Sequence, residues 1–320
     1  MADDGLVAAY LLSDPVRAIS WAEIERASPE APLWVHLDRA SERARDWLRS
    51  SSGLDAVVVE ALLADETRPR VTPFANGLVV ILRGVNLNPG ADPDDMVALR
   101  TWIEPRRLIT MRTRTLMAVQ DVRGEIEAGN GPSTVSDTFV RLVTRLVARV
   151  APVVDGLDEA LDRLEERVIE SPVRELRTEL AALRRTTIGL RRYLAPQRDV
   201  LARLGVDGVS LLDDRSRIRL RENVDTMIRY VEELDTVRER GAVLGEELHS
   251  LVAERMNRTM YVLSLVGTVF LPLGFVTGLL GVNVAGIPGS DWPLAFEVLA
   301  VLLVGVAAFE VMLFRRWRLL

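Results

Sequence analysis

The sequence predicts an α+β membrane protein: an α/β domain followed by a long helical stalk that continues into the first of two C-terminal transmembrane helices. Three observations support this fold class. Residues 1–131 mix strand and helix signals, residues 132–256 carry apolar residues at helical spacing, and residues 257–320 contain two long apolar segments. We therefore expect three regions with these boundaries, and only the last of them is apolar enough to cross a membrane.

The α/β domain is expected to hold a mixed or mostly antiparallel sheet. Its strand segments are rich in β-branched and aromatic residues, and the last two flank a turn that contains Pro105, which predicts a hairpin. Segments of helical composition separate the strands. The expected strands are Leu33–Leu37, Leu78–Leu82, Val97–Ile103 and Leu108–Met111, and the expected helices are Trp21–Ala27, Glu42–Leu48 and Leu54–Ala64.

Three helical runs follow. Apolar residues recur with a period near 3.6 from Thr134 to Val168, which predicts one amphipathic helix. Ser171-Pro172 is typical of a helix start, and the helix that begins there should end at the link Gly205–Gly208.

The third run begins near Asp213 and has no proline before Pro272. If it continues unbroken to Leu280, its length is roughly 100 Å at 1.5 Å per residue. A helix of that length exceeds one small domain, so we expect a stalk whose apolar stripe packs against neighbouring helices.

Two segments are long and apolar enough to span a bilayer. Met260–Leu280 has 21 residues and no charge, and a crossing helix needs about 20 apolar residues. Trp292–Phe314 is of similar length and carries Glu297 and Glu310 near its two ends. The connection between them, residues 281–291, is a Gly/Pro turn with one acid, Asp291, and no base.

The arginines next to the spans predict the topology. Arg255 and Arg258 precede the first span, Arg315, Arg316 and Arg318 follow the second, and the connecting loop has none. Since basic residues stay on the cytoplasmic side, both termini are expected in the cytoplasm and residues 281–291 on the outer side.

The composition argues against several functions. There is no Cys, which excludes thiolate metal sites and Cys nucleophiles, and the two histidines, His36 and His249, lie outside both spans. No phosphate-binding glycine loop is present, so we expect neither an enzyme nor a bound cofactor. A net charge of −6 argues against nucleic acid as a partner.

One face of the first span is polar or small. Because two spans cannot enclose a channel, several copies would have to surround an axis for transport, and this face would then line the pore. The same residues also suit close helix packing in lipid, which is the alternative explanation. The face consists of Asn257, Met260, Ser264, Gly267, Leu271, Gly274, Gly278 and, where the loop begins, Gly281.

The stretch from Asn257 to Asn283, with Leu271-Pro272 and the terminal Gly281-Val282-Asn283, resembles the CorA superfamily of two-span divalent-cation transporters. The residues that follow Asn283, and the segment Ala98–Arg112, make the chain more similar to the ZntB zinc transporters within it. CorA proper has Met and Tyr where this chain has Val282 and Leu280, which argues against a magnesium preference.

The resemblance implies a homopentameric funnel in a bacterial inner (plasma) membrane. The first span of each subunit would line the pore, and Gly281, Val282 and Asn283 would form the ion entrance. Asn283 oxygens would hold a hydrated cation through its waters, and Asp291 would attract cations to the loop. Zinc is the expected transported ion, and a magnesium, cobalt or nickel channel is the alternative. A membrane-anchored coiled-coil scaffold without transport is the hypothesis from another class.

Overall fold

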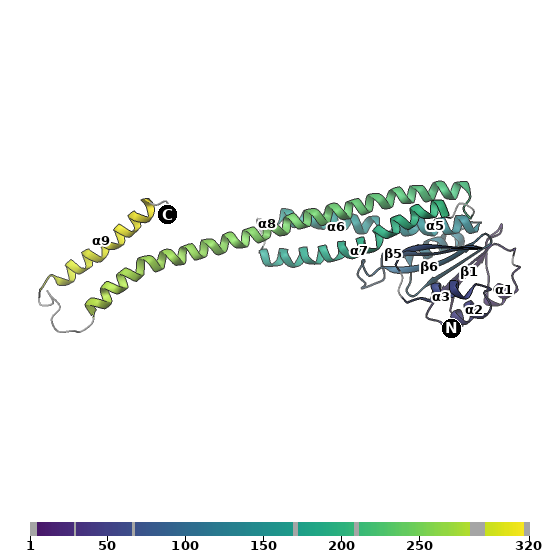
Figure 1. Ribbon diagram of the computed structural model, residues 1–320, viewed down its shortest axis with the longest axis horizontal. Coiled ribbons are helices and arrows are strands. Elements are labelled where there is room, and N and C mark those ends of the chain that lie inside the picture. The colour runs from purple at the N-terminus through teal and green to yellow at the C-terminus, as the bar shows by residue number, and fades with distance from the viewer. Residues whose placement is uncertain are drawn as a thin grey trace. The chain divides into compact units, whose positions relative to one another are not determined.

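The computed structural model describes residues 5–28, 30–65, 68–168, 172–207, 211–281 and 292–316. The chain divides into two compact units, residues 1–245 and residues 246–320, which are described separately below. Figure 1 labels the helices and strands.

The first unit contains a seven-stranded mixed sheet in the order β2-β1-β3-β7-β6-β5-β4. Neighbouring strands are antiparallel, except that β3 and β7 run parallel at the centre. The predicted mixed sheet, its four strands and the β6–β7 hairpin are therefore confirmed. The strands are β1 Leu6–Leu11, β2 Arg17–Ala18, β3 Leu33–Asp38, β4 Arg70–Phe74, β5 Gly77–Gly84, β6 Val97–Glu104 and β7 Arg107–Arg112.

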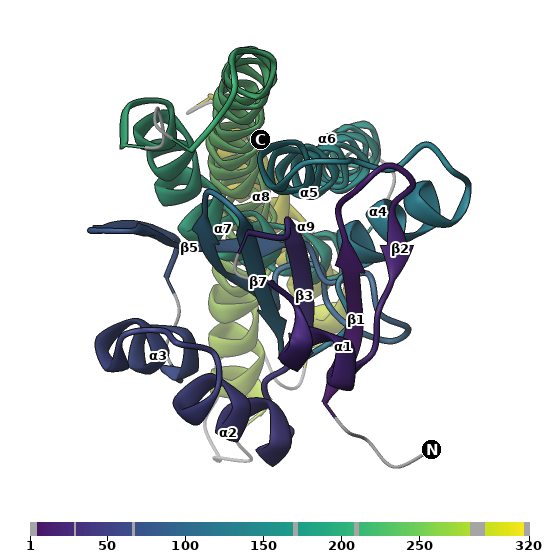
Figure 2. The ribbon, with the colours of Figure 1, turned by 90° about the vertical axis from the view of Figure 1, so that its right-hand side faces the viewer.

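Both faces of the sheet are covered by helices. Successive side chains of a strand point to opposite faces, so Trp34 belongs to the core that includes residues of α4 to α8, whereas Val35 belongs to the core that includes residues of α1, α2 and α3. Figure 2 shows α2 and α3 on one side of the strands and α5 on the other. The helices are α1 Trp21–Arg26, α2 Glu42–Ser50, α3 Ala56–Leu63, α4 Met117–Glu127, α5 Val135–Ala148, α6 Ala151–Glu166, α7 Val173–Asp207, α8 Asp214–Gly281 and α9 Ala295–Arg316.

The single helix predicted from Thr134 to Val168 is wrong, because the chain breaks between α5 and α6. Pro152 lies in the first turn of α6. It has no N–H for the carbonyl of Ala148, so the α5 ladder ends there. The Val150 N–H instead bonds to the Val147 carbonyl at 3.0 Å, and Val150 is fully buried. Apolar residues keep the helical spacing across the junction of α5 and α6, so the sequence pattern did not reveal it.

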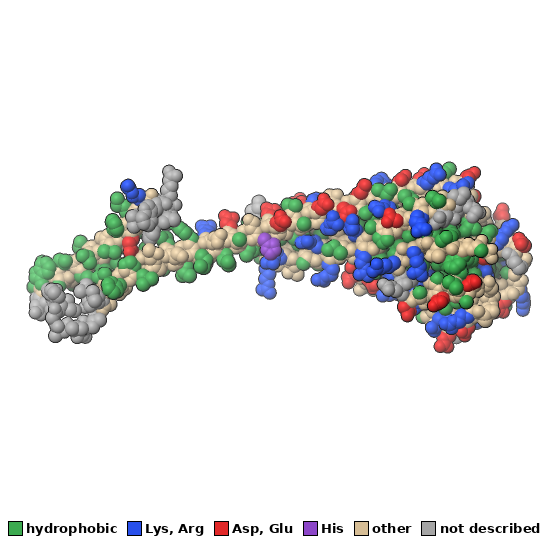
Figure 3. Space-filling view, in the orientation of Figure 1, with side chains coloured by type: hydrophobic (Ala, Val, Ile, Leu, Met, Phe, Trp, Pro, Cys, Tyr) green, Lys and Arg blue, Asp and Glu red, His purple; other side chains and the backbone are tan. Residues whose placement is uncertain are grey.

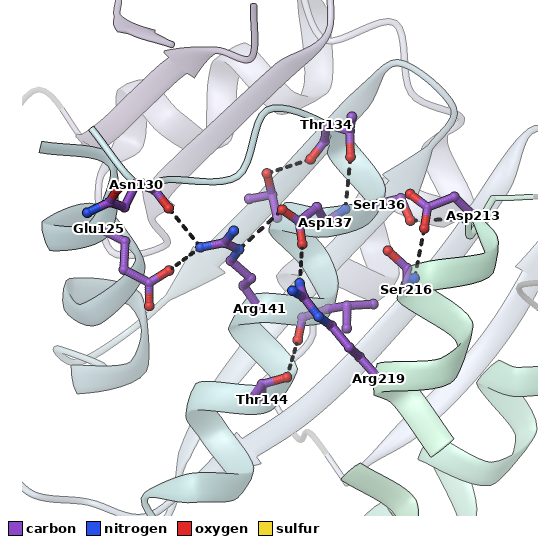
Figure 4. Close-up of polar contacts among 12 residues, drawn as sticks. Glu125, Asn130, Thr134, Ser136, Asp137, Arg141, Thr144, Asp213, Ser216 and Arg219 are labelled. Atoms are coloured by element: carbon purple, nitrogen blue, oxygen red, sulfur yellow. Dashed lines mark hydrogen bonds and ion pairs between the residues drawn. The ribbon is translucent and has the colours of Figure 1, made fainter. Parts of the chain in front are cut away.

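The N-terminal part of α8 is fastened to α5 by polar contacts (Figure 4). Arg219 donates to Asp137 at 2.7 Å, and Asn223 donates to the Thr144 hydroxyl at 2.9 Å. The backbone N–H of Asp213 donates to the Ser136 hydroxyl at 3.2 Å. The predicted unbroken third helix is confirmed, since α8 has 68 residues and includes Pro272. Its length is about 100 Å.

Candidate functional site

The predicted ion entrance falls at the end of α8. Gly281 is the last residue of that helix. Val282, Asn283 and the loop acid Asp291 lie outside the residues that the structure describes. Their roles therefore stay predictions from the sequence.

The predicted pore-lining residues all lie on α8 and share one face of it. Their spacing alternates between three and four residues, which keeps them on one side of a helix with a drift of about 20° per heptad. Every side chain of the set is at least partly exposed within the chain, with Met260 58% and Leu271 74% accessible. The set is Asn257, Met260, Ser264, Gly267, Leu271, Gly274 and Gly278.

The glycines of this face have open space in front of them. A Cβ atom placed on Gly267, Gly274 or Gly278 would meet no atom of the described chain within 4 Å outside the local helix backbone. Their small size is therefore not needed by any contact within this part of the chain. What they accommodate must come from outside it, such as another helix, an ion path or lipid.

Pro272 frees a carbonyl group beside this face. Because proline has no N–H, the carbonyl of Thr268 lacks its helical donor. At 100° per residue, Thr268 lies about 80° from the middle of the face. Its hydroxyl donates to the Ser264 carbonyl at 2.8 Å. The free carbonyl thus opens on the flank of the face, where a neighbouring helix can satisfy it.

Two helices are long and apolar enough to cross a membrane. The most apolar 18-residue windows of α8 and α9 have mean hydropathies of 1.9 and 2.2, and none of their residues is buried within the chain. Side chains that are both apolar and exposed require an apolar surrounding. Among the described residues, no group of three or more His, Cys, Asp or Glu side chains is placed to hold a metal ion.

The two histidines differ in environment. His36 is fully buried on β3, its Nδ1 lies 2.8 Å from the Thr110 hydroxyl, and Trp34 donates to the same hydroxyl at 2.9 Å. Burial, with a smaller contribution from Arg112, lowers the pKa of His36 to about 3. His36 is therefore a neutral core residue. His249 is exposed on α8.

A cavity of about 350 Å³ in the first unit is lined by charged residues, of which Glu125 pairs with two arginines. Arg141 donates to Glu125 at 2.8 Å, and Arg145 pairs with the same carboxylate. Burial alone would raise the pKa of Glu125, but hydrogen bonds from Arg141 and Arg145 outweigh it and lower that pKa. These ion pairs therefore link α4 to α5. The lining residues are Glu125, Arg141, Thr144, Arg145, Arg219, Glu222 and Asn223.

Fold and candidate face together define a class: a membrane protein with a sheet-containing soluble domain, a long helix and two apolar C-terminal helices. The sequence pattern of CorA-like Mg²⁺ transporter proteins matches residues 29–316. The chain is 45% identical over 293 residues, 91% of this chain and 88% of the relative, to the divalent cation transporter CmaX of Pseudomonas aeruginosa. It is 36% identical over 300 residues, 94% of this chain and 91% of the relative, to the zinc transport protein ZntB of Pectobacterium carotovorum subsp. carotovorum.

Solved structures agree with these relationships. The structure of full-length CmaX matches with a TM-score of 0.85 and 41% identity over 99% of each chain. The CorA magnesium transporter from Methanocaldococcus jannaschii matches with a TM-score of 0.82 over 97% of each chain, and at 18% identity it supports the fold alone. The chain belongs to the CorA-like family, which consists of divalent-cation transporters and not of enzymes.

Proposed function

We propose that this protein carries divalent cations, zinc foremost, into the cytoplasm through a central pore formed by five copies. The observation that supports this most is the continuous α8. It joins the soluble unit to a small and polar face, and that face leads to Gly281-Val282-Asn283. The same helix thus carries the proposed pore wall and ends at Gly281, the first residue of the proposed entrance.

Several copies are required because the described part of one chain supplies two candidate spans, and the resemblance to the CorA superfamily implies that their number is five. Around a common axis, the faces from Asn257 to Gly278 would form the wall, and five Asn283 side chains would ring the outer mouth. Amide and carbonyl oxygens suit a strongly hydrated cation, which they can hold by hydrogen bonds to its waters without trapping it. Gly281 lets the backbone approach the axis because it has no side chain.

Zinc is proposed as the transported ion because of the ZntB relatives, and not because of ligand residues in this chain. Zinc prefers Cys and His, but the chain has no Cys and neither histidine lies in a span. The cation therefore passes with much of its water shell in place. A magnesium, cobalt or nickel channel is the alternative, and competition among these ions in the flux assay separates the two.

The orientation rests on the arginines around the spans. Arg255 and Arg258 precede the first span, and Arg315 and Arg316 end the second. Since basic residues stay on the cytoplasmic side, the proposed orientation has both termini in the cytoplasm of a bacterial cell and residues 281–291, with Asp291, on the outer side of the inner membrane.

The test is zinc uptake into liposomes that contain the purified chain and a zinc-sensitive dye. Wild type should show uptake, and Asn283→Ala should reduce it by about tenfold or more, if each ring position supplies transient hydrogen bonds to the passing ion. The matched control is Asn130→Ala, because Asn130 is exposed and only its backbone carbonyl bonds to Arg141. Folded wild type without uptake of any divalent cation would refute the proposal.

The scaffold hypothesis has one observation in its favour: alternating spacings of three and four are also those of a coiled-coil seam. Gly267→Val separates the two. In a pore wall the added isopropyl groups, five around the axis, should abolish most flux. Val262→Leu, on the opposite side of the same helix, should leave flux near wild type. A scaffold predicts that neither substitution changes any transport activity.

A further inference from the structure

One side of α8 in the first unit carries acidic residues that face away from the rest of the chain. Met227, Leu234 and Leu244 form its packed side and are buried. The opposite side presents exposed residues at spacings of four, three and four, which place them within about 60° of one another. This acidic face of α8 comprises Glu232, Thr236, Glu239 and Val243.

One side of α7 is basic and also exposed. Its residues at positions i, i+1, i+4 and i+8 fall within about 100° around the helix. Ile188 at its centre is 53% exposed, which is unusual for an isoleucine in the middle of a long packed helix. This basic face of α7 comprises Arg184, Arg185, Ile188 and Arg192.

Several charged side chains on these two faces form no ion pair with the rest of the described chain. Among the described residues, no ion pair involves Arg184, Arg185 or Glu232, and Glu239 meets only its neighbour Arg238 at 3.4 Å. By contrast, Asp235 on another side of α8 pairs with an α7 arginine at 2.5 Å. Figure 3 shows acidic side chains along α8 and basic ones along α7.

The two faces lie at matching levels along the bundle. The Arg191–Asp235 pair fixes one level, and Leu180 beside Gly241 fixes a second, so α7 and α8 run antiparallel. Arg184 lies beside Gly241 and Gly245 of α8 in its own chain, which puts Arg184 and Arg185 near the level of Glu239 and Val243, and Arg192 is level with Glu232. Rotation about an axis along these helices keeps each level unchanged, so the basic face of one copy can meet the acidic face of the next.

We propose that the basic face of α7 docks on the acidic face of α8 in the neighbouring copy, and that this contact closes the ring. It rests on the assembly of several copies proposed above. The contact is heterologous, as a closed ring requires. Ile188 and Val243, 53% and 66% exposed, supply its apolar part, and the arginines and glutamates set its register.

Charge reversal and charge exchange in the full-length protein test this interface. R184E/R185E and E232R/E239R should each raise the protein concentration needed for assembly by about tenfold or more, because like charges then face each other. The quadruple variant, with both faces exchanged, should restore assembly. The particle mass in detergent, measured by light scattering over a dilution series, reports the assembly, and its salt dependence should weaken in both double variants.

The control is R26E on α1, an exposed arginine far from both faces in sequence, which should assemble as wild type does. If wild type itself is a monomer, the proposed pore fails. If wild type assembles and the double variants do so equally well, only this interface is overturned. Loss in the double variants without recovery in the quadruple variant also overturns it. A change of zinc flux without a change of particle mass would also overturn the interface, because the acidic face would then line a water-filled path.

Discussion

Arg240 is the strongest electrostatic contact between α6 and α8, and its loss should destabilise the first unit. It pairs with three carboxylates of α6: Asp158 at 2.8 Å, Asp162 at 2.5 Å and Glu165 at 2.7 Å. The hydrogen bonds that Arg240 donates to Glu165 and Asp162 raise the pKa of Arg240 above its ordinary value. Arg240→Ala removes all three pairs and leaves the three carboxylates to repel one another.

The effect is moderate because the pairs are partly exposed. The Arg240 side chain is 34% accessible, and its partners are 39–54% accessible. Exposed pairs contribute about 0.2–1 kcal/mol each, so three of them sum to roughly 1–2 kcal/mol. For a domain of this size that corresponds to a fall of about 3–6 °C in the thermal unfolding midpoint. Circular dichroism of the detergent-solubilised chain at low salt measures it.

Arg163→Ala is the matched control on α6. Arg163 makes one pair, with Glu159 at 3.5 Å, and both side chains are more than 60% accessible. Its midpoint should change by less than about 2 °C. In 1 M salt the Debye length is about 3 Å, so most of the Arg240→Ala effect should disappear. An effect that persists at high salt, or one no larger than that of the control, would refute the electrostatic explanation.

Three further outcomes follow from the buried polar groups. His36→Gln should flatten the dependence of stability on pH. The low pKa of His36, about 3, gives a contribution to the free energy of unfolding that is complete above pH 6.5 and lost toward pH 3. Thermal melts across that range should show a slope smaller by about 1.4 kcal/mol per pH unit in the variant. Glu125→Gln should destabilise at pH 7, but not once the pH falls below the lowered pKa of Glu125, and the same melts test this. Gln197→Ala should cost about 1–3 kcal/mol in thermal unfolding, since it removes both hydrogen bonds between the Gln197 amide and the backbone of Arg83, and an unchanged midpoint would contradict this.

The sequence predicted secondary structure best where the apolar pattern is local and extends over many residues. The four predicted strands contain runs of β-branched and apolar residues, because β3, β5 and β6 are covered on both faces and need apolar side chains throughout. Strands β1, β2 and β4 were not predicted. They lie toward the edges of the sheet, where fewer of their residues are buried, and β2 has only two residues.

The polar network of the first unit could not be predicted, because its partners are far apart in sequence. Arg219 and Asp137 are separated by 82 positions, and Gln197 and Arg83 by 114. The second contact depends on the extent of β4, which begins at Arg70 opposite Ile81, so its pairing with β5 does not reach Arg83. Only the folded topology reveals that need, and the amide of Gln197 satisfies it with bonds of 2.6 and 3.0 Å.

Three prolines show why helix ends are hard to predict from apolar periodicity. Pro152, Pro196 and Pro272 all follow a run of helical spacing, yet only Pro152 separates two helices. Each removes one helical hydrogen bond, so the local cost is similar. At Pro152 the chain turns between α5 and α6 because Val150 and Val154 are then buried in the core. At Pro196 burial of Leu194 and Gln197 on the same side favours a continuous helix. A proline by itself therefore does not decide whether a helix ends, because α7 and α8 continue through theirs.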